Sequence, residues 1–322
     1  MMKKTVFIDR RLPLHVLNFV SEHCHIKTYE PDEKRTRQAL LNHIKGCDGL
    51  FISSNEKIDD ELLSCAPELT VVSTMSVGYN HFDLIAMEKH GVIGTHTPYV
   101  LDDTVADLVF ALMLDVARRV SELDAYIKSR QWVGNEGSKL FGLNVHHKTI
   151  GIIGAGRIGD AILQRAVNGF NMKALYYNRH ERAALQEKYG AVYSDLTTLL
   201  EQSDFVVMMA PLTEETKHFL TYEHFKLMKK TSIFINASRG ATIKEDDLVR
   251  ALDENLIYGA GLDVFEREPL PTDHPFMKMK QVVMTPHIGS ATEQTREDMA
   301  MLAAKNLVHA LYGNGTYYKV MS

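Results

Sequence analysis

Three glycines that follow an apolar run have the spacing of a phosphate-binding turn. Gly154, Gly156 and Gly159 form a G-x-G-x-x-G pattern directly after 149–153, a β-branched run typical of a strand buried on both faces. Glycines at these positions permit a tight turn and a close approach of backbone to a pyrophosphate, which the free N–H groups of the next helix would bind. An ordinary glycine turn is the alternative. The apolar strand predicted at 173–177 favours a dinucleotide site.

Four polar residues follow later apolar stretches that we predict to be strands. They are Arg239, Asp263, Glu268 and His287. Because ligands of open α/β sheets bind beyond the carboxyl ends of the strands, we expect these side chains to converge on one crevice. Arginine can bind a carboxylate, and histidine beside a carboxylate can act as a general acid. Each residue alone is typical of a protein surface, but their common placement indicates a site.

The residues after the second predicted cofactor strand bear on which dinucleotide is bound. In NAD sites an acidic residue about 20 positions after the glycines accepts hydrogen bonds from the ribose hydroxyls. Here the uncharged Asn178 stands in that region, followed by Arg179 and Arg182. A carboxylate would repel a 2′-phosphate, whereas these side chains would attract one. NADP(H) is therefore expected to be preferred, with NAD(H) possible; a solvated charge cluster is the alternative.

Composition limits the remaining function classes. The chain has 322 residues, enough for two domains, and its net charge of −5 offers no basic surface for nucleic acid or a membrane. The most apolar predicted helix, 105–117, contains Asp107 and Asp115 and is better suited to burial or a subunit interface than to a bilayer. No metal site and a cytoplasmic location are expected, because there is no signal-peptide pattern and no metal-ligand spacing among Cys24, Cys47 and Cys65.

Repeated β-α units in the first hundred residues predict a small flavodoxin-like domain with a parallel sheet. After its strand at 70–74, the backbone N–H groups of Ser76, Val77 and Gly78 could bind a carboxylate. A plain strand-to-helix turn is the alternative for that loop. An amphipathic helix is predicted at 32–45.

The chain is expected to cross between two domains at Thr97-Pro98 and at Pro286-His287. Residues 1–97 with 288–322 would form one domain, and 98–287 the dinucleotide-binding domain. A long helix is predicted to be capped at Asp102 or Asp103. The aperiodic segment 129–147, which holds the only tryptophan, is predicted to be an arm around a partner subunit or a surface loop; the tail 313–322 would return to the first domain.

Several motifs together resemble one enzyme family, the D-isomer-specific 2-hydroxyacid dehydrogenases, over essentially the whole chain. They are the glycine turn, Asn-Ala-Ser-Arg-Gly at 236–240, Gly-Leu-Asp-Val-Phe-Glu-Arg-Glu-Pro at 261–269 and Thr-Pro-His-Ile-Gly-Ser at 285–290. Within the family the chain is most similar to the glyoxylate/hydroxypyruvate reductase and 2-ketogluconate reductase branch. The motifs that indicate this branch are Ser-Val-Gly-Tyr-Asn at 76–80, Val-His-His-Lys-Thr at 145–149 and Asn-Arg at 178–179.

The resemblance implies a two-domain α/β fold in which a Rossmann-type cofactor domain is inserted in a flavodoxin-like substrate domain. It also implies a homodimer that uses NAD(P)H to reduce a small 2-keto acid to the D-2-hydroxy acid; glyoxylate, hydroxypyruvate and 2-ketogluconate are candidates. D-lactate-type dehydrogenases remain an alternative, as does, in another class, a dinucleotide-sensing corepressor. Two other branches of the family are not expected. Formate dehydrogenases have glutamine where this chain has Glu268, and long phosphoglycerate dehydrogenases have a regulatory domain of the kind that we do not expect after residue 322.

The resemblance also implies roles for individual residues. Protonated His287 would give its proton to the carbonyl oxygen, and Glu268 would orient the ring and favour its charged form. Arg239 would bind the substrate's carboxylate and carbonyl oxygens, together with the backbone of Ser76, Val77 and Gly78. Asp263 would contact the nicotinamide carboxamide. All the predicted cofactor-binding residues are Thr104, Gly154, Gly156, Arg157, Ile158, Gly159, Asn178, Arg179, Pro211, Thr216, Ala237 and Asp263.

Overall fold

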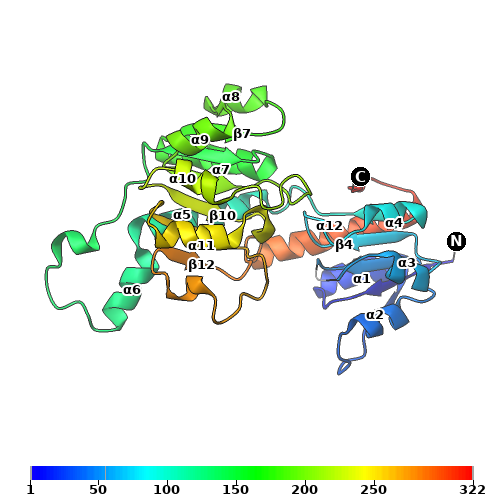
Figure 1. Cartoon of the computed structure of the whole chain (residues 1–322). Helices are drawn as coiled ribbons and strands as arrows, with labels where there is room; N and C mark the ends of the chain where they lie inside the picture. Colours follow the sequence, from blue (N-terminus) through cyan, green and yellow to red (C-terminus); the bar gives the residue numbers. More distant parts are fainter. Residues whose placement is uncertain (1, 55, 321–322) are drawn as a thin grey trace. The chain divides into compact units, whose positions relative to one another are not determined.

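The computed structural model describes residues 2–54 and 56–320 and contains two compact units, each built on its own parallel sheet (Figure 1). Unit 1 consists of the residues up to Leu101 and those from Ala291 onward, and unit 2 is Asp102–Ser290. The sequence predicts domain boundaries between residues 97 and 98 and between residues 287 and 288. The predicted α/β class with two parallel-sheet domains is confirmed.

Unit 1 has a five-stranded sheet in the order β2-β1-β3-β4-β5, in which every neighbouring pair is parallel. This order is that of flavodoxin-like folds, whose ligands bind at the switch point between β1 and β3. The strands are β1 (Lys4–Ile8), β2 (Cys24–Lys27), β3 (Gly49–Ile52), β4 (Val71–Thr74) and β5 (Ile93–Thr95), and the helices are α1 (Leu14–His23), α2 (Arg37–His43), α3 (Asp60–Cys65), α4 (Leu84–Lys89) and α12 (Glu293–Tyr312).

Helix α12 returns the end of the chain to the unit 1 sheet. The buried Ser73 hydroxyl of β4 donates to the Ala303 carbonyl at 2.8 Å, and near the other end of the helix Tyr312 donates to the His23 carbonyl at 2.7 Å. The tail then pairs with β5, since the Val320 amide donates to the Gly94 carbonyl at 2.9 Å. This agrees with the predicted course of the tail, whose last two residues lie outside the described residues.

The helix predicted at 32–45 is wrong at its start. Helix α2 begins only at Arg37, because the Thr36 hydroxyl accepts a hydrogen bond from the Ala39 amide and so caps the helix there. The long helix of unit 2 begins at Asp102, so that Asp102 and Asp103 both lie in its first turn, where negative charge is favourable.

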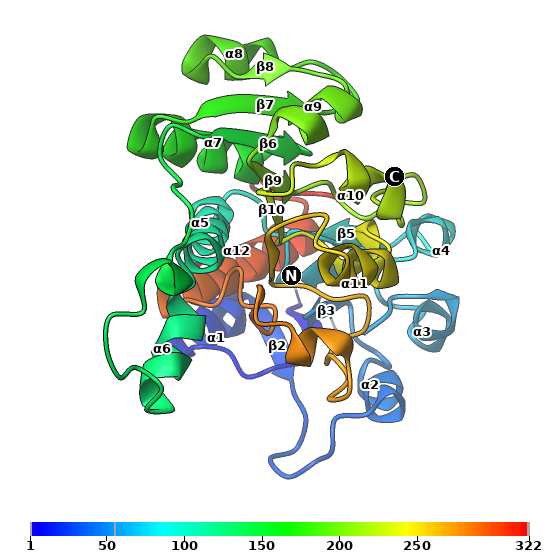
Figure 2. The same cartoon turned by 60° about the vertical axis from the view of Figure 1, so that its left-hand side comes forward.

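Unit 2 has a seven-stranded parallel sheet in the order β12-β11-β10-β9-β6-β7-β8. The chain proceeds from β6 in one direction and from β9 in the other, so the switch point lies between these two strands. The strands are β6 (Thr149–Ile153), β7 (Lys173–Tyr177), β8 (Val192–Tyr193), β9 (Phe205–Met208), β10 (Ile233–Asn236), β11 (Gly259–Leu262) and β12 (Val282–Met284). Figure 2 shows β6 and β7 side by side, with β8 and α8 beyond β7.

Two apolar cores cover the two faces of the unit 2 sheet. Helices α5 and α7 contribute to one core, and α9, α10 and α11 to the other. Helix α5 lies very close to β11, because a Cβ atom on Gly261 would be 2.9 Å from the Leu112 Cβ. The helices of unit 2 are α5 (Asp102–Arg118), α6 (Val120–Lys128), α7 (Arg157–Phe170), α8 (Ala183–Tyr189), α9 (Leu196–Gln202), α10 (Tyr222–Leu227) and α11 (Glu245–Asp253), with 3-10 turns η1 (Gly137–Leu140), η2 (Gly240–Thr242) and η3 (Pro275–Lys278).

Helices in the described part of the chain are all too short or too polar to cross a membrane.

Candidate active site

The glycine turn after β6 has the geometry that a diphosphate needs. Gly154 has a φ of 91°, and a Cβ atom there would lie 2.3 Å from the Ala210 nitrogen, so only glycine fits. A Cβ atom on Gly156 would meet nothing within 4 Å, which leaves the backbone at the start of α7 accessible. Gly156 has no side chain to cap α7, so no side chain at the N-cap competes with an anion at the start of this 14-residue helix.

Asn178 and Arg182 brace this turn from the end of β7. The Asn178 Oδ1 accepts from the Ala155 amide at 2.7 Å, and its Nδ2 donates to the Ala155 carbonyl at 3.3 Å. Arg182 Nη1 donates to the carbonyls of Ala155 and Gly156 at 2.6 and 3.0 Å. The sequence predicts a phosphate-binding role for both residues, but in the structure their side chains stabilise the turn.

Arg179 differs from these two neighbours. Its side chain is 82% exposed, and its Nη1 lies 3.6 Å from Glu215 Oε2, whose side chain is also largely exposed. A pair of this kind contributes little to stability, so the Arg179 guanidinium can readily change partners.

The other predicted cofactor residues also lie at the carboxyl edge of the unit 2 sheet or at the starts of helices beside it. Arg157 in α7 donates to Asp102 Oδ2 at 3.2 Å, which joins the starts of α7 and α5. The Thr216 hydroxyl donates to the Pro211 carbonyl at 2.6 Å and closes the loop after β9. Gly159 and Ile158 lie in the first turn of α7, Thr104 in that of α5, and Ala237 directly after β10.

The loop after β10 fixes the position of Arg239. The buried Asn236 side chain shapes the loop, donating to the Arg239 carbonyl at 3.1 Å and accepting from the Ser238 amide at 3.1 Å. A Cβ atom on Gly240 would lie 1.8 Å from the Phe265 carbonyl carbon, so the loop after β11 packs directly on Gly240. Burial lowers the pKa of Arg239, against the opposing effect of the Glu268 charge, but a guanidinium stays protonated throughout the physiological range.

His287 and Glu268 form a hydrogen-bonded pair. His287 Nδ1 lies 2.7 Å from Glu268 Oε2, and the Phe265 amide donates to the other oxygen, Oε1, at 3.1 Å. Burial raises the pKa of Glu268, but the hydrogen bonds from His287 and Phe265 and the charges of His287 and Arg239 outweigh it, so the net pKa is lowered. Glu268 is therefore an anion that holds the ring of His287 through Nδ1 and leaves Nε2 for a substrate.

The buried carboxylate of Asp263 holds the turn that carries His287. Only 1% of Asp263 is exposed, and burial raises its pKa. Its Oδ1 accepts from the Thr285 hydroxyl at 2.7 Å and the Ile288 amide at 2.8 Å, and its Oδ2 accepts from the Gly289 amide at 2.9 Å. His287 itself has a φ of 53°, a left-handed conformation that these bonds support. The sequence suggests only a contact to the nicotinamide for Asp263 and does not reveal this role.

In unit 1, the loop after β4 points its carbonyls inward. The carbonyls of Ser76, Val77 and Gly78 accept from the Thr97 amide, the His96 ring and the Ser76 hydroxyl, at 2.9, 2.9 and 2.7 Å. The amides of the same three residues have no acceptor among the described residues. This arrangement favours the anion-binding interpretation of the loop over a plain turn.

Comparisons with known proteins agree with this geometry. The family profile "D-isomer specific 2-hydroxyacid dehydrogenase, NAD binding domain" matches residues 110–289, and the chain is 45% identical to glyoxylate/hydroxypyruvate reductase B of Escherichia fergusonii over 97% of this chain and 96% of that protein. The chain belongs to this family. The predicted family and its glyoxylate/hydroxypyruvate reductase branch are thus confirmed, and this dehydrogenase is an oxidoreductase that uses a nicotinamide dinucleotide.

Solved structures are similar over almost the whole chain. The TT0316 protein of Thermus thermophilus is 37% identical, with a TM-score of 0.90, and the match covers 98% of this chain and 100% of that one. An NADPH-dependent glyoxylate/hydroxypyruvate reductase from Sinorhizobium meliloti, in complex with NADP and malonate, is 28% identical with a TM-score of 0.85; the match covers 99% of this chain and 97% of that one.

Replacing Asp263 with Asn tests its role in positioning His287. An amide nitrogen cannot accept the hydrogen bonds that one carboxylate oxygen accepts, so the turn should shift and kcat of the dehydrogenase should fall by about ten- to a hundredfold. Steady-state kinetics would show this loss with KM for the cofactor nearly unchanged, and the exposed Asp273→Asn should behave as wild type. A rise in the cofactor KM with an unchanged kcat would instead identify Asp263 as a cofactor contact only.

Replacing Glu268 with Gln tests the pair through the pH dependence of kcat/KM. The pKa of Glu268 is lowered, so its carboxylate becomes protonated only at low pH. The wild-type rate of keto-acid reduction should therefore begin to fall only in that low pH range. Glutamine should abolish this acid limb. The exposed Glu187→Gln is the control, and a Glu268→Gln profile that superimposes on wild type would disprove the pair.

Proposed function

We propose that the protein reduces a small 2-keto acid to the D-2-hydroxy acid with NADPH, and that glyoxylate or hydroxypyruvate is the preferred substrate, with 2-ketogluconate a further candidate. The observation that carries the proposal is the hydrogen bond of 2.7 Å between His287 Nδ1 and Glu268 Oε2. Asp263 holds the turn that carries His287, and this turn lies at the same edge of the sheet as Arg239. The relatives from Escherichia fergusonii and Sinorhizobium meliloti are named glyoxylate/hydroxypyruvate reductases, which supports this substrate class.

The residues of the chain divide the chemistry among them. The bound nicotinamide would supply the hydride. His287 would donate a proton from Nε2 to the carbonyl oxygen as negative charge develops there, and Glu268 would keep the ring oriented through Nδ1. Arg239 would bind the keto acid through its guanidinium. No carboxylate of the described residues lies within 4 Å of that guanidinium. The free amides of Ser76, Val77 and Gly78 would bind a substrate carboxylate.

The preference for NADPH rests on the charges after β7. With Asn178 and Arg182 bonded to the glycine turn, Arg179 is the exposed cation left for a 2′-phosphate. The Sinorhizobium meliloti enzyme is described as NADPH-dependent, which supports the same preference. NAD(H) is proposed as the weaker cofactor.

A homodimer is proposed from the surface of α6 and the segment after it. Figures 1 and 2 show this part of the chain lying away from the unit 2 sheet. Its exposed apolar side chains favour burial against a second copy of the chain. They are Val120, Ile127, Trp132, Val133 and Phe141. The cytoplasmic location remains a prediction from the sequence.

The proposed reaction is tested by a rate panel with glyoxylate, hydroxypyruvate, pyruvate and 2-ketogluconate, each with NADPH and with NADH. The highest kcat/KM is expected for glyoxylate or hydroxypyruvate with NADPH, measured by loss of cofactor absorbance. Pyruvate as the best substrate would indicate a D-lactate-type dehydrogenase. Cofactor binding without oxidation by any keto acid would indicate a dinucleotide-sensing protein.

Replacing Arg179 with Gln tests the cofactor preference. Losing a charge-assisted hydrogen bond to the 2′-phosphate should raise Kd for NADPH about tenfold or more, while Kd for NADH stays within about twofold. Fluorescence titration of both cofactors measures this. Glu215→Gln removes only the ion partner of Arg179 and should therefore not raise Kd for NADPH. Equal weakening of both cofactors by Arg179→Gln would contradict the assignment.

A further inference from the structure

Two arginines of unit 1 lie at the carboxyl edge of its sheet and take no part in the chemistry described so far. Arg10 follows β1, which borders the switch point between β1 and β3 where flavodoxin-like sheets bind ligands. Arg296 is in the first turn of α12. The contacts of Ala303 and Tyr312 along α12 show that the helix starts at this carboxyl edge and runs toward the opposite one.

Neither guanidinium has a partner among the described residues. The Nε of Arg10 is buried and makes no hydrogen bond, and no described carboxylate lies within ion-pair distance of Arg10 or Arg296. A buried donor without an acceptor is unfavourable, and two guanidinium groups near each other repel. Consistent with this, the pKa of Arg296 is lowered by burial and then by the charge of Arg10.

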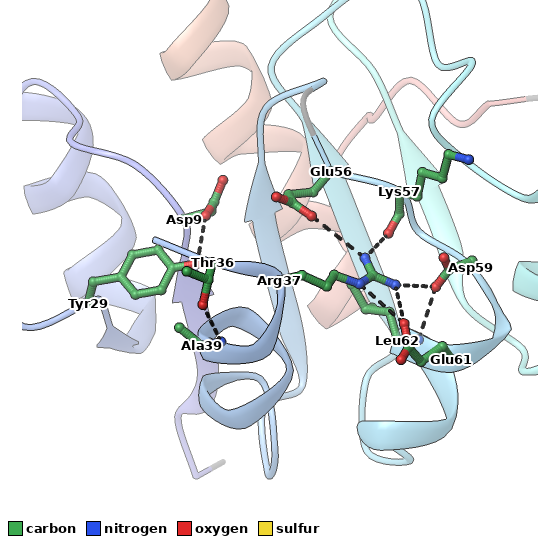
Figure 3. Close-up of polar contacts among 10 residues, drawn as sticks. All are labelled: Asp9, Tyr29, Thr36, Arg37, Ala39, Glu56, Lys57, Asp59, Glu61 and Leu62. Carbon is green, nitrogen blue, oxygen red and sulfur yellow. Dashed lines mark hydrogen bonds and ion pairs between the residues drawn. The ribbon is translucent and has the colours of Figure 1, made fainter. Parts of the chain in front are cut away.

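Figure 3 shows the contacts that engage Asp9, Glu56, Asp59 and Glu61, the acidic side chains of this part of unit 1. Asp9 is the carboxylate whose charge acts on Arg10, but its Oδ1 accepts from the Tyr29 hydroxyl at 3.1 Å. Glu56 Oε2 lies 3.8 Å from Arg37 Nη1, and Arg37 also pairs with Asp59 and Glu61 at the start of α3. Glu56, Asp59 and Glu61 are thus matched with Arg37. The charge of Asp9 partly offsets that of Arg10 without forming an ion pair, and no described carboxylate offsets the charge of Arg296.

We propose that Arg10 and Arg296 bind an anionic group at the far end of a 2-keto acid whose first carboxylate is held by the amides of Ser76, Val77 and Gly78. Guanidinium groups bind carboxylates and phosphates through two parallel hydrogen bonds, and an anion would both satisfy the buried donor and cancel the repulsion. This inference rests on the proposed function and extends it to 2-keto acids that carry a second carboxylate or phosphate.

The spacing of the strands agrees with a substrate longer than glyoxylate. Ser76 follows β4 and Arg10 follows β1, and these strands are separated only by β3. Neighbouring strands lie about 4.8 Å apart, so the two chain segments start roughly 10 Å apart. An arginine side chain and a keto acid of about five carbons are together long enough to bridge that separation, whereas a keto acid of two carbons is too short.

The test compares two keto acids of equal length, 2-ketoglutarate and 2-ketovalerate, which differ by one terminal carboxylate. In wild type the diacid should have a kcat/KM about ten- to a hundredfold higher. Arg10→Gln and Arg296→Gln should each remove most of this ratio, mainly through KM for the diacid, and Arg296→Lys should keep part of it. The exposed Arg11→Gln and Lys305→Gln are matched controls and should keep the wild-type ratio.

Other outcomes separate this inference from the reaction itself. Reduction of glyoxylate by wild type tests the proposed function independently, since glyoxylate is too short to reach Arg10. If glyoxylate is reduced but the diacid has no advantage in wild type, the inference is wrong. If inorganic phosphate then raises the thermal unfolding midpoint of wild type but not of the two glutamine variants, the arginines bind a free anion instead of substrate. The proposal would also be overturned if Arg10→Gln and Arg296→Gln both kept the wild-type preference for 2-ketoglutarate over 2-ketovalerate while their thermal unfolding midpoints were unchanged.

Discussion

The buried carboxylate of Asp263 determines the position of His287. Three donors from residues 285–289 converge on it, and the turn they form holds His287 in a left-handed conformation, which is unfavourable for most residues other than glycine. Burial of a carboxylate is unfavourable unless its oxygens accept hydrogen bonds, so the turn and the aspartate depend on each other. The proton donor is therefore positioned by the backbone that surrounds it as well as by its own contact with Glu268.

Close backbone packing connects the loop that carries Arg239 to the loop that carries Glu268. Gly240 follows Arg239 and lies against the backbone of Phe265, whose amide also donates to Glu268. A side chain at position 240 would push these loops apart. The distance between Arg239 and the His287–Glu268 pair is thus maintained by the absence of one Cβ atom together with the register of β10 and β11. Packing of the backbone, and not the conformation of a flexible side chain, thus brings Arg239 and the His287–Glu268 pair together.

The sequence predicts the parts of the site that depend on local order along the chain. Arg239, Glu268 and His287 follow predicted strands, and parallel strands bring their carboxyl ends to one edge, so their convergence follows from the strand pattern. The pairing of His287 with Glu268 is implied by the family resemblance, and the structure has this hydrogen bond. Side chains that turn back across the sheet are different. Asn178 and Arg182 bond to the glycine turn of the neighbouring strand, and Asp263 bonds to a loop that approaches only after folding. Arg10 and Arg296 are likewise brought together by the tertiary path of α12.

Asn178 combines two properties that restrict how the protein can evolve. Its amide holds both polar groups of Ala155 in the glycine turn, while its place after β7 is the one from which related proteins read the ribose. An ancestral change at this position would alter the stability of the turn and the choice of dinucleotide at once. Arg179 has no such structural bond, so selection could adjust the cofactor there in small, independent steps. Divergence within the family should therefore begin at position 179, and changes at 178 should follow only in backgrounds that stabilise the turn by other means.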